Sequence, residues 1–161
     1  MLIGIDASRA VIAQRTGTEA YSLHLIRGLL EIGTAHRFRL YLNSPPSPGL
    51  MPNVAHCEQR VMPFPRLWTH LRLSVEMLFH PPDVLWVPSH VLPLIHPRRS
   101  VVTVHDLTTV HHPELCHRAT LAYPGLVQRA IDRGAVVHTV SEFVAEEVRD
   151  HFDVDPRAVV A

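Results

Sequence analysis

The stretch Ser100-Val-Val-Thr-Val-His105-Asp106 is a short, β-branched apolar segment that ends abruptly in two ionisable residues. An apolar run of this length, dominated by Val and Thr, predicts a strand buried on both faces, as in a parallel sheet. His105 and Asp106 would then lie at the carboxyl edge of that sheet, where ligands bind in open α/β folds. The stretch therefore predicts a fold class and the position of a site.

Three other apolar runs end in the same way. They are Ile3-Gly-Ile-Asp6 followed by Ala7-Ser8-Arg9, Val84-Leu-Trp-Val87 followed by Pro88-Ser89-His90, and Val136-Val-His-Thr-Val140 followed by Ser141-Glu142. Because the carboxyl ends of parallel strands meet at one edge of a sheet, these polar residues are predicted to form one shared site.

Short apolar runs alternate with helical patterns along the whole chain. We expect strands at residues 2–6, 38–42, within 54–62, 84–87, 101–105, 136–140 and from 159, and helices at 16–32, 66–79, 119–133 and 141–152. This alternation predicts an α/β fold, a Rossmann-like parallel sheet of about six to seven strands with helices on both faces. We expect residues 1–161 to form a single domain. Since the last apolar run is cut after Ala161, we also expect it to belong to a longer protein.

The helix ends are marked by capping signals. Thr16 followed by Glu19 matches a capping box, which predicts Thr16 as the N-cap of the first helix. Leu23, Ile26 and Leu30 recur at helical spacing and are expected to be buried, and Gly33 is expected to end this helix. In the helix expected over 66–79, the buried stripe is predicted to consist of Leu67, Leu71, Val75 and Leu78.

Composition excludes several classes of function. Fifteen basic residues balance fifteen acidic ones, so charge gives no reason to expect nucleic-acid binding. Every basic residue is Arg, which excludes a Schiff-base lysine or a P-loop lysine. Cys57 and Cys116 lack CxxC spacing, which is typical of reduced thiols in a cytoplasmic protein. The chain opens on a predicted strand without a signal peptide, and no apolar stretch is long enough to span a bilayer.

His105 and Asp106 are the candidate catalytic residues. A strand-terminal imidazole can hydrogen-bond a sugar hydroxyl or a phosphate, and Asp106 can accept from a hydroxyl or act as a base. The structural alternative is a His bonded to backbone at a strand end and an Asp that caps the next turn. We favour the functional interpretation because a polar pair at this edge is costly to keep without partners.

Further binding candidates lie at two helix starts and one strand end. Gly17, between Thr16 and Thr18, lies where free N–H groups and the helix dipole favour an anion such as a nucleotide phosphate. The alternative is a capped turn, since neither GxGxxG nor GxxxxGK[ST] is present. Ser89 and His90 would contribute to the site or merely cap the strand, with even weight.

Ser141 and Glu142 are first of all helix-start residues. Ser141 is predicted as an N-cap and Glu142 as a complement to the dipole, with a binding role second. His111, His112 and His117 follow no zinc-ligand spacing, so they are expected to be solvated loop residues and no metal site is predicted.

The order of segments resembles the amino-terminal domain of the GT-B-fold retaining glycosyltransferases, often called group 1 or family 4. The matching segments are Ile3-Gly-Ile-Asp-Ala-Ser8, Thr16-Gly-Thr-Glu-Ala-Tyr-Ser-Leu-His-Leu-Ile-Arg-Gly-Leu29, Val84-Leu-Trp-Val-Pro-Ser89, Val101-Val-Thr-Val-His-Asp-Leu107 and His138-Thr-Val-Ser-Glu-Phe143. The resemblance implies a cleft between two Rossmann-like domains, of which the amino-terminal one binds the acceptor. The carboxy-terminal one holds the nucleotide sugar and carries a paired-glutamate motif.

The resemblance also implies roles for individual residues. Gly17 would approach the donor diphosphate, His105 would contact the transferred sugar, and Asp106 and Ser141 would line the cleft. This chain contains no paired-glutamate segment. It is therefore expected to lack the donor domain and to be inactive in isolation.

Two hypotheses follow. In the first, the chain is the acceptor-side domain of an enzyme that moves a sugar from a nucleotide-sugar donor to a hydroxyl of a saccharide or lipid-linked acceptor. That reaction would need little or no divalent cation and no other cofactor. In the second, it is a non-catalytic binding module or a truncated remnant whose exposed edge self-associates. The expected location is the cytoplasm. Arg66, Arg72 and Trp68 could contact the inner membrane face, although a solvated face over a buried stripe is the alternative that we favour.

Overall fold

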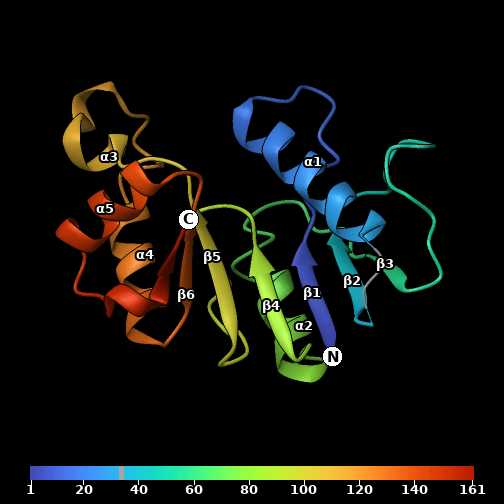
Figure 1. Cartoon of the computed structure of the whole chain (residues 1–161). Coiled ribbons are helices and arrows are strands. Elements are labelled where there is room, and N and C mark those ends of the chain that lie inside the picture. Colours follow the sequence, from blue (N-terminus) through green and yellow to red (C-terminus); the bar gives the residue numbers. More distant parts are fainter. Residues whose placement is uncertain (33–34) are drawn as a thin grey trace.

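The computed structural model describes residues 1–32 and 35–161 and contains one seven-stranded parallel sheet (Figure 1). The strands are β1 (Leu2–Asp6), β2 (Arg37–Leu42), β3 (Cys57–Val61), β4 (Val84–Val87), β5 (Ser100–Val104), β6 (Val136–Thr139) and β7 (Val159–Val160). The helices are α1 (Gly17–Glu31), α2 (Arg72–Phe79), α3 (Thr108–His111), α4 (Tyr123–Asp132) and α5 (Glu142–His151), with short 3₁₀ turns at Pro113–Leu115 and Pro156–Ala158. The predicted α/β fold with helices on both faces is confirmed.

The strand order β3-β2-β1-β4-β5-β6-β7 reverses direction between β1 and β4. Strands β1 to β3 follow one another towards one end of the sheet. The chain then crosses to the other side of β1, where β4 to β7 follow one another towards the opposite end. Because parallel crossovers are right-handed, this reversal places the connecting helices of the two halves on opposite faces. Figure 1 shows α1 and α2 on opposite sides of the strands. The loops at such a reversal point diverge and leave a crevice at the carboxyl edge.

Each face of the sheet carries its own apolar core. On one face, α1 packs Leu23, Ile26 and Leu30 against β1 and β2, as predicted. On the other face, α2, α4 and α5 pack against β4, β5 and β6. In β1, Gly4 is required by close packing, because a Cβ there would lie 2.7 Å from both Pro82 and the ring of Tyr41.

The predicted helix ends are partly confirmed. Thr16 and Glu19 form the reciprocal capping box, with the backbone N–H of Thr16 3.0 Å from the Glu19 carboxylate. Gly33, the expected end of this helix, lies outside the described residues. After α4, Gly134 ends the helix in the left-handed region at φ 82°. The helix expected over 119–133 begins later, at Tyr123, after a series of turns.

The prediction for residues 66–79 is wrong in two respects. The helix begins at Arg72, since Leu67 adopts a left-handed conformation at φ 54° and the segment up to Leu71 forms turns. The predicted buried stripe is exposed, whereas Leu73, Ser74, Glu76 and Met77 face the core. Both sets recur at helical spacing. The buried set contains a carboxylate, so apolar periodicity alone selected the wrong face. No helix within the described residues is long and apolar enough to cross a membrane.

Candidate functional site

A groove runs along the carboxyl edge of the sheet at the point where the strand order reverses. Its larger part is a cavity of about 410 Å³, and its smaller part is a cavity of about 70 Å³. The two parts share Arg9, Ser89, Val91 and Tyr123, so we treat them as one space, the edge groove. The larger part is also lined by Ser8, Ile12, Asn43, Leu67, Trp68, Thr69, His70 and Ala119, and the smaller part by Thr18 and His90.

Asp6, the last residue of β1, holds two walls of the groove together. Its carboxylate accepts from the backbone N–H of Ser8 at 3.0 Å and from the hydroxyl of Thr69 at 3.2 Å. Burial raises the pKa of Asp6 above its ordinary value, although the hydrogen bonds from Ser8 and Thr69 act in the opposite direction. Asp6 therefore connects the segment after β1 with the segment that carries Thr69. Ser8 and Thr69 line the groove, whereas Asp6 does not.

The Trp68 ring forms part of the groove wall while remaining almost wholly buried. Its indole N–H donates to the carbonyl of Met62 at 2.8 Å, and its ring belongs to the same apolar cluster as Leu73 and Met77. The buried ring is not available for the membrane contact that the sequence analysis gave for Trp68 as the less favoured interpretation. Because the hydrogen bond to Met62 and the apolar cluster hold the indole in place, it offers a rigid apolar edge to a ligand in the groove.

Two predicted site residues, His90 and His105, are in contact. The backbone N–H of His105 donates to Nε2 of His90 at 2.9 Å, and Nε2 of His105 donates to the carbonyl of Pro88 at 3.1 Å. These partners place the hydrogen of His90 on Nδ1 and that of His105 on Nε2. Within the described residues no hydrogen bond involves Nδ1 of His105, so this nitrogen is available to a ligand.

Aromatic rings extend the histidine pair in both directions. Tyr123 packs edge-on against His90 with centroids 5.3 Å apart, and Tyr21 of α1 packs edge-on against His105 at 5.0 Å. The Tyr21 hydroxyl lies 3.4 Å from Nδ1 of His138 on β6. Four rings therefore connect α4, the β4 and β5 ends and α1 along the carboxyl edge.

The buried environment keeps His90 neutral. Burial, together with the neighbouring His105, lowers the pKa of His90 from 6.5 to about 4. The folded state therefore binds fewer protons than the unfolded state between about pH 6.5 and pH 4. The stabilisation from neutral His90 is complete above about pH 6.5 and is lost as the pH falls through this window.

Replacing His90 by Gln should remove much of this pH dependence. The Gln amide oxygen can accept from the His105 N–H, but the side chain does not titrate. We expect the free energy of unfolding of His90→Gln to fall less than that of the unmodified chain below pH 6.5, by up to about 3 kcal/mol. Urea unfolding across this pH range measures the difference. His24→Gln, at an exposed position on α1, is the matched control and should follow the unmodified chain. Identical pH profiles for all three proteins would contradict the assignment.

At the amino end of α1, the predicted anion-binding residues surround the helix start. Thr16 is the N-cap, Gly17 is the first helical residue, and Thr18 lines the smaller part of the groove. No heavy atom lies within 4 Å of the position that a Gly17 Cβ would occupy, so this surface is open. Arg9 donates to Glu19 at 3.1 Å and adds a cation at the junction of the two parts of the groove. The arrangement can hold an anion beside a hydroxyl-rich ligand.

The remaining predicted residues lie at the same edge but outside the groove lining. Asp106 accepts from the backbone N–H of Thr108 at 2.9 Å, and this bond helps to lower its pKa although burial opposes it. Ser141 accepts from the backbone N–H of Val144 at 3.3 Å as the predicted N-cap of α5. Glu142 pairs with Arg149 at 3.7 Å. These contacts match the structural alternatives, and the binding roles of the three residues stay predictions.

The histidine-rich loop provides no metal centre. His111 lies 2.9 Å from the half-buried Glu147, and His112 lies 3.4 Å from the exposed Glu114. Among the described residues no group of three or more His, Cys, Asp or Glu side chains is placed to hold a metal ion.

Ser8 and Arg9 belong to the strand-end segment that was predicted to contribute to one shared site, and both line the groove. Sequence reasoning assigned no role in the groove to two other lining residues. Tyr123 and Trp68 lie on α4 and on the turns before α2. They reach the groove only because these helices pack on one face, which no local pattern indicates.

The sequence matches no protein-family profile and no curated protein sequence. Among solved structures, the fold is similar to a crystal structure of WaaG, described as a glycosyltransferase involved in lipopolysaccharide biosynthesis, with a TM-score of 0.64 and 11% sequence identity. The chain therefore shares the fold of the part of that glycosyltransferase that it matches. The match covers 99% of this chain but 44% of that chain, so this chain spans less than half of its structural neighbour. At this identity the likeness establishes the fold and not the chemistry.

Proposed function

We propose that this chain is the amino-terminal, acceptor-binding half of a retaining glycosyltransferase. Such an enzyme transfers a sugar from a nucleotide-sugar donor to a hydroxyl of a saccharide or lipid-linked acceptor. The observation that carries the proposal is the edge groove, which lies at the reversal point of a glycosyltransferase-like sheet. A groove at this position is where a ligand is expected in an open parallel sheet.

The groove lining suits an acceptor sugar. Trp68 and Tyr123 offer flat apolar surfaces, whereas Ser8, Thr69 and Ser89 offer hydroxyl groups. A sugar presents both an apolar ring face and a ring of hydroxyls, so it can use both kinds of contact. The lining contains one arginine and no carboxylate, which favours a neutral or anionic acceptor over a cationic one.

In this proposal the nucleotide-sugar donor contacts the carboxyl edge of the sheet at Gly17 and His105, beside the groove. The open surface at Gly17 would accept the diphosphate, and the free Nδ1 of His105 would accept a hydrogen bond from a hydroxyl of the transferred sugar. Positioning and backbone N–H donors would supply the catalytic effect, with the second half of the enzyme holding the nucleotide. The isolated chain should then bind acceptor without turning it over. We propose a cytoplasmic location for this reaction.

Binding to the isolated chain tests the proposal. Titration of the ¹⁵N-labelled chain with a methyl glycoside or a short oligosaccharide should shift the Trp68 indole signal and the amides of Thr69 and Tyr123. UDP-glucose should give small shifts confined to amides around Gly17 and His105. Shifts elsewhere, or none up to the solubility limit of the saccharides, would contradict the proposal.

A pair of variants connects the titration to the groove. Tyr123→Ala should abolish the saccharide-induced shifts by removing one apolar wall. Leu115→Ala, which truncates a highly exposed side chain outside the groove lining, should leave them unchanged. If both variants bind saccharide like the unmodified chain, the groove is not the acceptor site.

A further inference from the structure

Two neighbouring residues of α1 lie beside the imidazole of His105. The ring of Tyr21 packs edge-on against it, with ring centroids 5.0 Å apart and ring planes at 88°. The hydroxyl of Ser22 lies 3.3 Å from the carbonyl of Pro88, which also accepts the hydrogen bond from Nε2 of His105. The end of β4 therefore holds Nε2 of His105, and α1 contacts its ring.

A chain of hydrogen bonds on the α1 side of the sheet reaches the hydroxyl of Tyr21. The indole N–H of Trp86 donates to the hydroxyl of Thr103 at 3.0 Å. Since an indole N–H can only donate, the Thr103 oxygen is the acceptor, and its own hydrogen needs a further acceptor. The structure provides one in Nδ1 of His138, 3.4 Å away, and the Tyr21 hydroxyl lies at the same distance from that nitrogen. Nδ1 of His138 therefore accepts from both hydroxyl groups, and the hydrogen of this imidazole is on Nε2.

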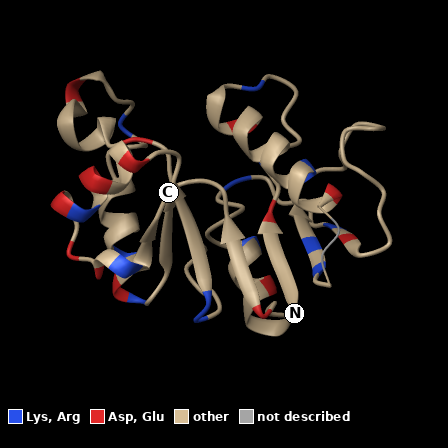
Figure 2. Cartoon of the chain, viewed as in Figure 1, with Lys and Arg blue, Asp and Glu red and all other residues tan. Residues whose placement is uncertain are grey.

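Burial leaves this chain of hydrogen bonds few alternative arrangements. Thr103 is fully buried and Trp86 is 8% exposed, so neither side chain can turn to water instead. Burial, together with His105, lowers the pKa of His138, which keeps its Nδ1 an acceptor. Burial also raises the pKa of Tyr21, so its hydroxyl stays a donor. Strands β4, β5 and β6 contain no Lys, Arg, Asp or Glu that would replace these partners (Figure 2).

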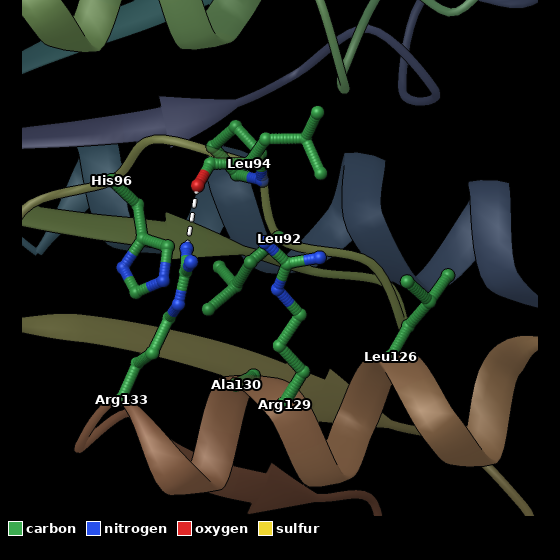
Figure 3. Close-up of a pocket in the computed structure, with 8 residues that line it drawn as sticks. Leu92, Leu94, His96, Leu126, Arg129, Ala130 and Arg133 are labelled. Carbon is green, nitrogen blue, oxygen red and sulfur yellow. Dashed lines mark hydrogen bonds between the residues drawn. The ribbon is translucent and has the colours of Figure 1, made fainter.

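The connection between β4 and β5, which carries Pro88 and His90, is fixed separately at its far end. Figure 3 shows Arg133 of α4 reaching this connection, where its guanidinium donates to the carbonyl of Leu94 at 2.6 Å. The imidazole of His105 is thus placed from two sides, by an anchored connection on one side and by the ring of Tyr21 on the other.

We propose that Tyr21 and His138 are positioning residues for His105. His138 accepts from the hydroxyl of Tyr21, and the Tyr21 ring holds the imidazole of His105 so that its Nδ1 keeps a lone pair for a ligand. If the His105 ring turns, Nε2 leaves the carbonyl of Pro88 and the hydrogen can move to Nδ1, which then no longer accepts. An imidazole that is already oriented also loses less conformational freedom when a ligand binds. That a sugar hydroxyl uses this nitrogen rests on the proposed function, whereas the orientation of the ring does not.

The ring nitrogens of the histidines report this arrangement without any ligand. At a pH well above the ordinary pKa of histidine, long-range ¹H–¹⁵N spectra should show His105 and His138 each as one neutral tautomer with the hydrogen on Nε2. Tyr21→Phe and His138→Leu remove the same hydrogen bond from its two ends. Each should shift the His105 nitrogen signals towards the average of the two tautomers. The double variant should shift them no further than His138→Leu alone, because the two changes break one contact.

A conservative variant and two controls separate positioning from general disturbance. His138→Asn keeps an acceptor, because the amide oxygen of Asn can take the place of Nδ1, and it should restore the His105 signals. His24→Leu, at an exposed position on α1, and Arg129→Gln, beside the small cavity of Figure 3, should leave them unchanged. UDP-glucose should bind Tyr21→Phe and His138→Leu about fivefold more weakly than the unmodified chain, the usual contribution of one hydrogen bond.

Unchanged His105 signals in Tyr21→Phe or in His138→Leu overturn the proposal, and so does a second tautomer of His105 in the unmodified chain. Equal changes in His138→Leu and His138→Asn also overturn it, because the acceptor then makes no difference. Tyr21→Phe removes a single oxygen, so the test stands even if His138→Leu does not fold. If UDP-glucose shifts no signal of the unmodified chain, the proposed function fails, whereas the histidine spectra still decide on the positioning of His105.

Discussion

The double variant Arg60→Ala/Arg72→Ala is expected to lose about 3–5 kcal/mol of unfolding free energy, because it leaves a buried charge uncompensated. Glu76 is 3% exposed, and both arginines lie within 3.4 Å of its carboxylate. After their removal, the imidazole of His80 is the remaining polar neighbour, with its Nδ1 3.5 Å from the carboxylate and its side chain largely exposed. Equilibrium urea unfolding followed by circular dichroism measures the loss.

Two comparisons show whether the buried charge causes this effect. Glu76→Leu removes the charge and fills the same space, so we expect it to cost much less than the double variant. Glu58→Ala removes the exposed pair with Arg39 on the neighbouring strands and should cost less than about 1 kcal/mol. If the double variant unfolds within 1 kcal/mol of the unmodified chain, the two arginines do not compensate the buried charge of Glu76.

Much of the fold was predictable because many of its strands and helix starts are determined by residues close together in the sequence. The run Ser100–Val104 is rich in valine because β5 is covered on both faces over most of its length. Thr16 with Glu19 marks the start of α1 through contacts within one turn. The orientation of α2 was not predictable in this way. Both of its faces carry apolar residues, and the buried one is selected by Arg60, which comes from a neighbouring strand. Periodicity in one segment contains no information about that partner.

The candidate site shows the same division between local and distant signals. Ser89 and His90 follow β4 and line the groove, since parallel strands end at one edge, and their binding roles stay predictions. The strand-end pattern did not separate residues that line the groove from residues whose side chains cap the next helix or turn. Asp106 and Ser141 follow strands in the same way as Ser89, yet their side chains are engaged by backbone N–H groups of the next turn. Such caps satisfy a polar side chain locally, and so a polar strand end is a weaker sign of a ligand than the pattern suggests.

Trp68→Ala should lose about 3–5 kcal/mol of unfolding free energy and should also abolish saccharide-induced shifts in the edge groove. The ring fills space between the groove and the apolar core that contains Leu73 and Met77, so its removal leaves a cavity that the rigid sheet cannot close. Urea unfolding by circular dichroism gives the stability, and the amide of Thr69 reports saccharide binding.

Trp68→Phe separates the contributions of the ring and of its hydrogen bond. The Phe ring keeps an apolar wall, but the carbonyl of Met62 loses its 2.8 Å donor, which should cost about 1–2 kcal/mol. Saccharide binding to Trp68→Phe should survive, weakened, because a flat ring still faces the groove. If Trp68→Ala is stable to within 1 kcal/mol and still binds saccharide, the indole is neither part of the core nor part of the acceptor site. If Trp68→Phe alone loses all binding, the acceptor contact depends on the indole itself rather than on an apolar wall.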